Sequence, residues 1–321
     1  MDGGGGEGDG SVGGTDPLLP DGCGTYGELV GLSVSAATLE EVTTVAGQRL
    51  REVEAREAQS STELPGKGRE EPVAPVEHLC ISLDGTMVNT HEGWREVKVV
   101  SISEVEEREE PTPEGRLVAL VKHSYRAGFW EAKEFGEEQW AEAQRRGVEV
   151  AGRLTCVNDG AVWIWALVLM CYPLAVQVVD WWHAVDRLWK VGNMVLGQGN
   201  DKTRAWVTER KDDLWAGRVR AVIAALGEPK PQGEEAEKEV RLLREYLQIH
   251  ADRMRYQEFR ELGVPIGSGT VESGCKNVVG SRMKRGGMRW KVERAEGVLA
   301  LRCALLSDRW QLAWGQQRQA A

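Results

Sequence analysis

The sequence is poor in the residues that build metal clusters and disulfide frameworks. It contains 6 cysteines in 321 residues, and no two of them form a CxxC pair. It contains only 5 histidines, and none of them lies in a Cys/His cluster. A structural zinc site therefore has no ligand set here. Single, well-separated cysteines are typical of a protein in a reducing cytosol rather than of a disulfide scaffold.

Long apolar runs are scarce as well. No apolar run opens the chain, so we expect no signal peptide. Only residues 161–179 form an uncharged stretch long enough to reach across a bilayer. Pro173 interrupts this stretch, aspartates flank it, and its last third has the pattern of a strand. We therefore predict a buried helix, a turn and a buried strand, and a protein with no membrane association.

The acidic balance of the whole chain conceals a basic end. The formal net charge is −10, but residues 276–321 contain 10 Lys and Arg against 3 Asp and Glu. This distribution excludes a protein that binds DNA by bulk charge, as histones do, and leaves a nucleic-acid partner open. Tryptophan is abundant, with 13 Trp against 3 Phe, and we expect most of these rings in the core.

Composition divides the chain into five parts. The first two are a Gly-rich disordered tail and a short helical segment with a linker. The helix is predicted over 32–58 with Ser35 or Thr38 as its cap, and three prolines mark the linker over 59–76. The remaining parts are the first part of a catalytic core, a helical insertion, and C-terminal core helices with a basic segment. The predicted boundaries are 1–22, 23–78, 79–183, 184–264 and 265–321.

Segments with strand and helix patterns alternate after residue 78. An acidic loop joins the second and third strands as a hairpin, and helices over 132–147 and 161–172 separate the later strands. Three consecutive strands followed by right-handed crossovers place the first and fourth strands side by side, in the order 3-2-1-4-5. We therefore predict an α/β protein with a mixed five-stranded sheet and a ribonuclease-H-like fold. The predicted strands are 79–84, 95–103, 116–125, 152–159 and 174–180.

Two aspartates close neighbouring strands of this predicted sheet. Asp84 and Asp159 each end a strand, and each precedes a glycine. Adjacent parallel strands lie about 4.8 Å apart, so two such carboxylates can hold a hard cation such as Mg²⁺. Glu272, on a helix predicted to begin near Thr270, can supply a third carboxylate. Taken singly, a strand-end aspartate also fits a helix cap or a turn, and the residues alone leave both interpretations open.

Five motifs in order point to a family. They are ISLDGTMV, GWREVKV, NDGAVWIW, VVDWWHAVDRLW and VPIGSGTVESGCKNVVGSRMKRGGMRW. With these motifs the chain resembles the DDE transposases of bacterial insertion sequences, of the ISKra type, which are related to the Mutator-like and hAT-like lineages. The resemblance covers residues 79–312, with a weaker likeness at VGLSVSAATLEEVTTVAGQRL.

The resemblance implies a set of catalytic residues. Asp84, Asp159 and Glu272 would be the catalytic carboxylates and the ligands of two Mg²⁺ ions, for which Mn²⁺ can substitute. Asp180 and His183 resemble the accessory motif of the lineage, in which two residues separate a Cys or Asp from a His. A metal shared with Asp84 favours Asp159 over Asp180, because the fifth strand lies one strand further away. The alternative for His183 is a histidine at a helix start that bonds to the backbone.

The basic residues near the C-terminal end are expected to contact DNA phosphates. Such contacts give affinity that depends on salt and not on base sequence. Lys276 shares a helix face with Glu272 and can neutralise the site or reach a phosphate, and Ser268 and Thr270 are expected as caps. The alternative for the basic run is a solvated helix face, and Trp290 is expected in the core. The expected DNA-contacting residues are Lys276, Arg282, Lys284, Arg285, Arg289 and Lys291.

The resemblance also implies partners and a reaction. The protein would cleave and join DNA at element ends and target sites, as a homodimer or larger assembly in the bacterial cytoplasm. Relatives have more N-terminal sequence, which recognises the element ends, whereas residues 1–78 here are short, acidic and Gly-rich. Two alternatives follow. One is a catalytically silent DNA-binding remnant, and the other is a nuclease of the same fold that acts on branched or hybrid substrates.

Overall fold

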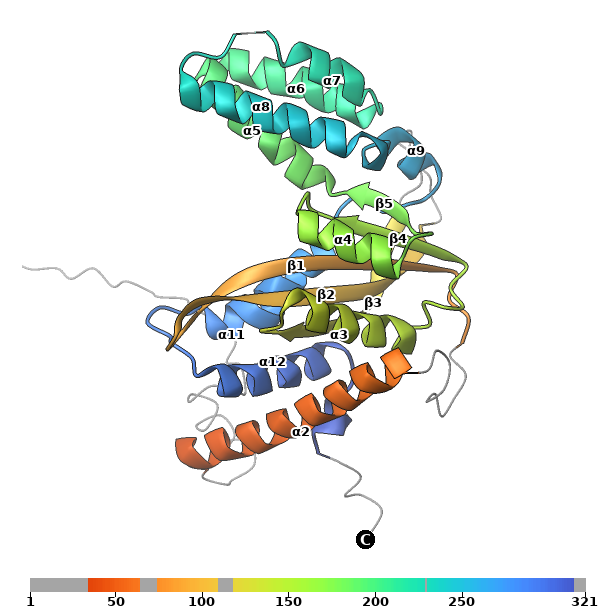
Figure 1. Cartoon of the computed structure of the whole chain (residues 1–321), viewed down its shortest axis with the longest axis vertical. Helices are drawn as coiled ribbons and strands as arrows, with labels where there is room; N and C mark the ends of the chain where they lie inside the picture. The colour runs from red at the N-terminus through yellow and green to blue at the C-terminus, as the bar shows by residue number, and fades with distance from the viewer. Residues whose placement is uncertain (1–33, 64–73, 109–117, 229, 315–321) are drawn as a thin grey trace, which may run out of the picture.

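The computed structural model describes residues 34–63, 74–108, 118–228 and 230–314. Its centre is a five-stranded mixed sheet in the order β3-β2-β1-β4-β5 (Figure 1), so the predicted order is confirmed. β1, β2 and β3 form an antiparallel meander, and β4 and β5 run parallel to β1. The strands are β1 (His78–Thr90), β2 (Gly93–Glu107), β3 (Val118–Gly128), β4 (Arg153–Asn158) and β5 (Val176–Val179).

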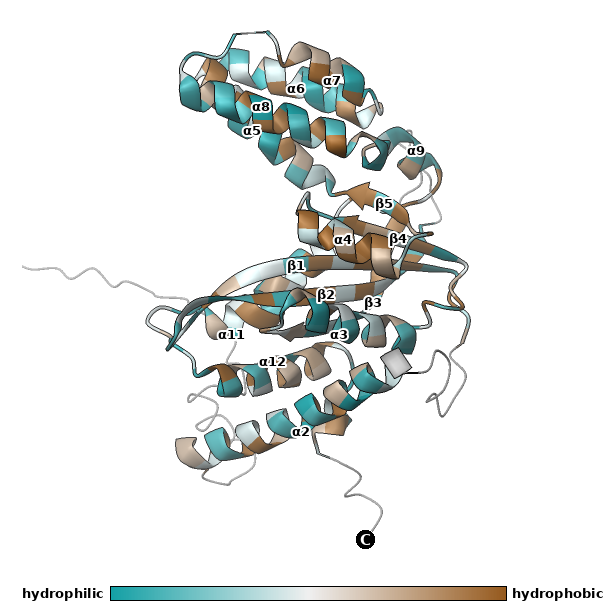
Figure 2. Cartoon of the chain, in the orientation of Figure 1, coloured by the Kyte–Doolittle hydropathy of each residue, from teal (hydrophilic) through white to brown (hydrophobic). Residues whose placement is uncertain are grey.

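Two apolar clusters cover the two faces of the sheet. On one face, Val100 and Ile102 of β2 belong to a cluster that includes side chains of α3 (Ala132–Arg145) and α4 (Val162–Cys171). On the other face, Val97 and Val99 belong to a cluster with residues of the C-terminal helices. This split follows from the alternation of side chains along a strand. Figure 2 shows brown, hydrophobic residues concentrated on β4, β5 and α4.

A helical unit lies beyond β5, at one end of the molecule (Figure 1). Buried apolar side chains hold it together, including Leu188 of the first helix, Val207 of the second and Leu247 of the fourth. Among the described residues of 181–264 there is no strand, as the sequence predicts. The helices are α5 (Trp181–Leu196), α6 (Asp201–Trp215), α7 (Val219–Ala225), α8 (Glu234–Ile249) and α9 (Tyr256–Glu261), with a 3₁₀ turn, η1 (Ala251–Arg253).

The chain then returns to the sheet as a helix of mixed type. α10 (Gly269–Gly274), the π-helical η2 (Cys275–Gly280) and α11 (Ser281–Met283) follow one another directly, before α12 (Val292–Leu306) and a 3₁₀ turn, η3 (Trp310–Ala313). The N-terminal helix α2 (Ala36–Glu63) packs against α12 at a glycine pair. A Cβ on Gly47 would lie 2.5 Å from the carbonyl oxygen of Gly297, so this crossing requires glycine.

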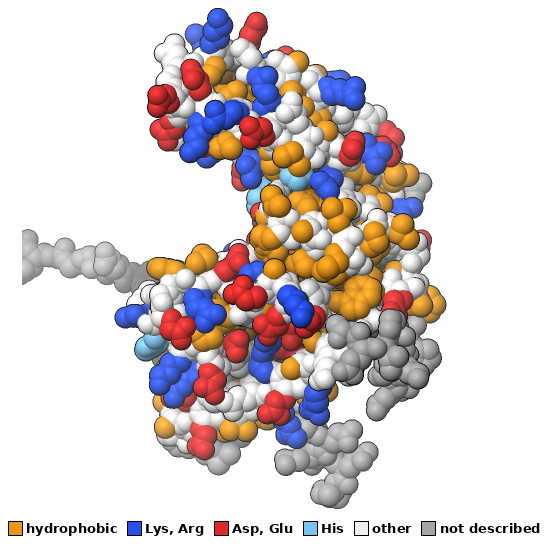
Figure 3. All heavy atoms as spheres, in the orientation of Figure 1, with side chains coloured by type: hydrophobic (Ala, Val, Ile, Leu, Met, Phe, Trp, Pro, Cys, Tyr) orange, Lys and Arg blue, Asp and Glu red, His pale blue; other side chains and the backbone are white. Residues whose placement is uncertain are grey.

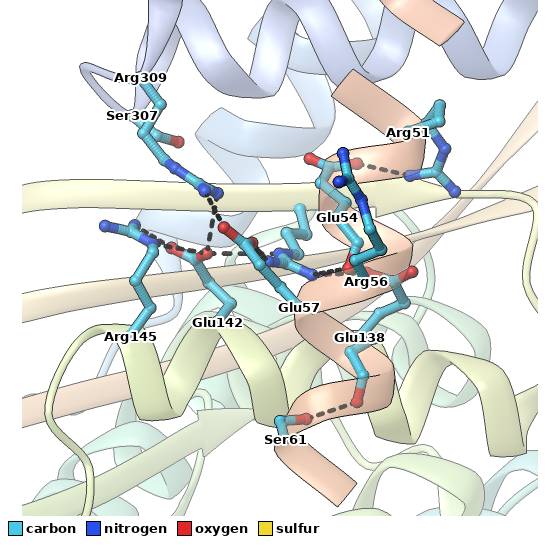
Figure 4. A network of polar contacts seen from close by, with 12 residues as sticks. Arg51, Glu54, Arg56, Glu57, Ser61, Glu138, Glu142, Arg145, Ser307 and Arg309 are labelled. Carbon is cyan, nitrogen blue, oxygen red and sulfur yellow. Dashed lines mark hydrogen bonds and ion pairs between the residues drawn. The ribbon is translucent and has the colours of Figure 1, made fainter. Parts of the chain in front are cut away.

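A buried arginine joins α2 to the sheet. Arg126 of β3 is fully buried and forms ion pairs with Glu57 of α2 and with Glu138 and Glu142 of α3 (Figure 4). Arg309 pairs with the same Glu57 and Glu142 from the other side. A buried charge is strongly destabilising without a partner, so these pairings hold α2 against β3 and α3.

Several predicted boundaries were wrong. β1 does not end at Asp84 but continues to Thr90, because its ladder with β2 runs as far as the Thr90–Gly93 pair. α2 reaches Glu63 and thus includes the start of the predicted linker. The last long helix ends at Leu306 rather than near 312. The predicted tail over 1–22 lies outside the described residues.

Two other predictions about helices are confirmed. Ser35 is the cap of α2, since its hydroxyl accepts a hydrogen bond from the Thr38 amide at 3.0 Å. Residues 162–171 form the predicted helix α4, and β5 follows after Pro173. Within the described part of the chain, no helix has both the length and the apolar character needed to cross a membrane.

Candidate active site at the carboxyl edge of the sheet

Three aspartates stand in one row across the parallel part of the sheet. Ile81 pairs with Cys156, and three further residues on each strand lead to Asp84 and Asp159. Asn158 pairs with Val179, and the next residue on each side is Asp159 or Asp180. Neighbouring strands lie about 4.8 Å apart, so the register alone brings these carboxylates side by side, at the ends of β4 and β5 and within the longer β1.

Asp84 faces the C-terminal helices. It pairs across the sheet with Val99, whose side chain belongs to the cluster on that face. Its Oδ1 accepts a hydrogen bond from the Gly85 amide at 2.7 Å, and its Oδ2 accepts one from Cys275 Sγ at 3.1 Å. Burial raises the pKa of Asp84, and the charge of Asp159 adds to this rise although the two hydrogen bonds oppose it. The carboxylate is therefore one that a cation would stabilise.

Asp159 also shapes the turn that begins α4. Its Oδ1 accepts a hydrogen bond from the Ala161 amide at 2.8 Å, and its carbonyl oxygen accepts one from Trp165 Nε1 at 2.8 Å. A Cβ on the next residue, Gly160, would lie 2.1 Å from the Tyr246 ring of α8. Asp159 therefore stabilises a turn, which is one of the two roles that the sequence left open for it. The same contacts hold its carboxylate at the end of β4.

Asp180 and His183 form a close pair at the start of α5. Asp180 is fully buried, and its Oδ1 accepts hydrogen bonds from the His183 amide at 2.8 Å and from His183 Nδ1 at 3.1 Å. Its Oδ2 accepts a hydrogen bond from the Ser268 amide. Burial alone would raise the pKa of Asp180, but the bonds from His183 and Ser268 outweigh it and lower this pKa. The bond to Asp180 raises the pKa of His183 to about 9, so its ring is a cation at neutral pH.

The Glu272 carboxylate lies beside the Asp180–His183 pair. Its Oε1 is 3.9 Å from His183 Nδ1, and Ser268 Oγ donates a hydrogen bond to it at 3.5 Å. Among the described residues, Asp180, His183 and Glu272 are the only three His, Cys, Asp or Glu side chains whose ligand atoms all lie within 4.8 Å of one another. The carboxylate oxygens of the predicted set, Asp84, Asp159 and Glu272, do not all lie within 4.8 Å of one another. One turn after Glu272, however, Cys275 contacts Asp84, so the same helix passes over both ends of the row.

Other predictions about this helix need correction. Ser268 is at the N-cap position of α10, but its hydroxyl bonds to Glu272 and makes no cap bond to the backbone. Sequence reasoning also missed Cys275, the direct partner of Asp84. Its position three residues after Glu272, on the same face of a helix, was the only signal for it.

The predicted basic track divides into two kinds of residue. Lys276, Arg285, Arg289 and Lys291 are exposed, as phosphate contacts require. Arg282 lies over the Trp290 ring, 4.8 Å from its centroid, and is part of the packing of the segment. Lys284 Nζ bonds to the hydroxyl of Thr86, two residues beyond Asp84, which places the basic loop beside the row of aspartates.

Comparison with family models and with curated protein sequences gave no match. The ligand atoms of the site itself indicate which ion it can hold. The oxygens of Asp84, Asp159 and Glu272 are the hard ligands that Mg²⁺ and Mn²⁺ prefer. His183 is the one nitrogen ligand in the closer group, and its Nδ1 is already engaged in the hydrogen bond with Asp180. The all-carboxylate set thus fits such an ion better than the tighter Asp-His-Glu group does.

Proposed function

We propose that this protein is a metal-dependent enzyme that cleaves and joins DNA strands, of the DDE transposase type. The observation that carries the proposal is the row of Asp84, Asp159 and Asp180 on adjacent parallel strands, over which one helix brings Glu272. In this proposal the sheet is a ribonuclease-H-like core and α5–α9 are its helical insertion. The protein would act on DNA in the bacterial cytoplasm.

The residues have separate roles in this proposal. Asp84, Asp159 and Glu272 would hold two Mg²⁺ ions, and such ions would activate the attacking oxygen and stabilise the leaving one. Asp180 fixes the His183 ring through Nδ1 and leaves Nε2 directed away from that bond. The His183 cation can then bind a phosphate oxygen of the strand being cut.

The basic loop supplies the remaining affinity for DNA. Lys276, Arg285, Arg289 and Lys291 are exposed around the helix that carries Glu272, so they can bind the phosphates flanking the scissile bond. Such contacts position the backbone without reading its sequence. Lys284 is tied to Thr86, so it holds the loop against β1 and is a weaker candidate for a phosphate contact.

Nicking of supercoiled plasmid in Mn²⁺ tests the proposal. Asp84→Asn, Asp159→Asn and Glu272→Gln should each lower nicking by at least about 10²-fold, since each removes a ligand for the ions. Plasmid binding in a filter assay without metal should change little. Asp252→Asn, an exposed aspartate of η1, is the matched control and should nick as the wild type does.

Two outcomes would favour a different function. A wild-type protein that binds DNA with strong salt dependence but never nicks it is a DNA-binding protein without this chemistry. A protein that cuts branched or RNA–DNA substrates but never joins a 3′ end to a second duplex is a nuclease of the same architecture.

A further inference from the structure

One face of α5 carries a second cation beside the candidate active site. His183 and Arg187 are four residues apart on this helix, so their side chains share a face and lie about 6 Å apart along the axis. His183 bonds to Asp180 and lies 3.9 Å from the Glu272 carboxylate. Arg187 is exposed, one helical turn further along α5. The face of α5 that meets the carboxylates therefore continues into the helical unit with a positive charge.

The ring of Tyr246 holds Arg187 over the turn that follows Asp159. The Arg187 guanidinium carbon lies 4.1 Å from the centroid of this ring, which belongs to α8. The same ring packs on Gly160, where a Cβ would lie 2.1 Å from it. Burial raises the pKa of Tyr246, and the Arg187 charge opposes this rise. The charges of Asp159 and Asp180 add to it. The arginine and two of the aspartates therefore lie around one side chain.

Arg187 keeps its capacity to bind an anion in this position. A cation–π contact uses the face of the guanidinium group, whereas its N–H donors lie in the plane of the group. Lys190, three residues later on α5, pairs with Glu239 of α8 at 2.8 Å. Arg187 has no such ion pair with a carboxylate in the part of the chain that the structure describes. A guanidinium group with free in-plane donors matches the geometry of a phosphate.

The surface is hollowed between the helical unit and the sheet. Figure 3 shows this hollow, with pale blue histidine at its inner end. Cations reach the site from two separate elements, because Arg187 belongs to α5, whereas the exposed Lys276 and Arg285 belong to the helix and loop after Glu272. A DNA strand that crosses the row of aspartates would meet positive charge on both elements.

We propose that Arg187 binds a backbone phosphate of the DNA strand being cut, next to the phosphate that His183 binds. In this role, which rests on the proposed function, Arg187 makes the helical unit part of the DNA-binding surface. His183 lies beside the carboxylates and Arg187 lies one turn away, so the two cations suit two successive phosphates. Such a contact fixes the path of the strand without reading its base sequence.

Anisotropy of a fluorescein-labelled duplex, measured over a series of salt concentrations, tests the contact. Ca²⁺ is added because it prefers carboxylate oxygens and can occupy the row. Arg187→Gln should weaken binding about tenfold and lower the slope of log K against log salt by about 1, since one phosphate contact is lost. Arg187→Lys keeps the charge and should keep the slope, with a smaller loss of affinity. Arg220→Gln, at an exposed arginine of α7, is the matched control and should change neither.

Nicking in Mn²⁺ gives a second measurement. Arg187→Gln should raise KM for the plasmid more than it lowers kcat, because the residue binds DNA beside the scissile bond. Circular dichroism checks that the variant folds. If Arg187→Gln does not fold, Arg187→Met, which keeps an apolar stem over the Tyr246 ring, replaces it.

The outcomes separate this inference from the proposed function. An unchanged salt slope in Arg187→Gln overturns the inference, and so does an equal change in Arg220→Gln. A wild type that nicks plasmid while Arg187→Gln keeps its slope therefore loses only the role of Arg187. A protein that binds DNA through Arg187 but never nicks it loses only the chemistry. A wild type that does not bind the duplex contradicts both.

Discussion

Replacing Asp180 by Asn should remove much of what holds His183 in place. Asp180 is fully buried and accepts three hydrogen bonds, two from His183 and one from the Ser268 amide. An asparagine of the same shape offers one acceptor oxygen and an NH₂ group that can only donate. One of these donors, on Ser268 or His183, therefore loses its acceptor inside the protein.

The size of the effect follows from two contributions. A buried donor left without a partner costs about 1–3 kcal/mol. The pKa of His183 is about 9 against an ordinary value of 6.5, which at 1.36 kcal/mol per unit sets an upper limit of about 3.4 kcal/mol. Its side chain is 43% exposed, so solvent screening reduces this contribution to about 1–2 kcal/mol. We expect Asp180→Asn to lose about 2–5 kcal/mol of unfolding free energy at pH 6.

The loss should depend on pH in one direction. A pKa raised in the folded state gives stability that is complete below pH 6.5 and disappears as the pH rises through about 9. Urea unfolding at pH 6 and pH 10 should therefore give a smaller loss at pH 10. NMR titration of the His183 ring, assigned by His183→Gln, should show its pKa falling toward 6.5 in Asp180→Asn. A His183 pKa that stays near 9 in this variant, or equal losses at both pH values, would refute the reasoning.

Three further predictions concern the rest of the molecule. Arg126→Met leaves Glu138 and Glu142 buried without their common partner and should cost about 3–5 kcal/mol in urea unfolding, and a cost below 1 kcal/mol contradicts the role of the network. Gly47→Ala pushes α2 away from α12 and should cost about 1–3 kcal/mol. Gly286→Ala, in open space, should be neutral, and equal losses would show that the crossing is not the cause. Mn²⁺ at ten times its dissociation constant should stabilise the wild type by about 1.4 kcal/mol, and an equal gain in Asp84→Asn would place the ion elsewhere.

Much of the fold could be predicted from local pattern. Local strand and helix patterns marked the elements of the sheet, and each of Asp159 and Asp180 directly follows the strand it was expected to close. Two crossover connections then determine the strand order, because right-handed crossovers leave few alternatives. The row of aspartates follows from that order together with the register.

The contacts between distant segments could not be predicted in this way. The extension of β1 past Asp84 depends on its pairing with β2 rather than on its own sequence. The hydrogen bond from Cys275 to Asp84 joins residues 191 positions apart, and the approach of Glu272 to His183 depends on how α10 meets α5. A single sequence indicates which side chains share an edge of the sheet, whereas their partners from other elements are determined by tertiary packing.

The most direct test of the central claim is a crystal grown with Mn²⁺ and measured at the manganese absorption edge. The anomalous signal locates the ion independently of any enzymatic assay. We predict anomalous peaks for two ions among Asp84, Asp159 and Glu272, with Glu272 turned from His183 toward them. A peak held by Asp180 and His183 with Glu272, or no peak at millimolar Mn²⁺, would contradict the account.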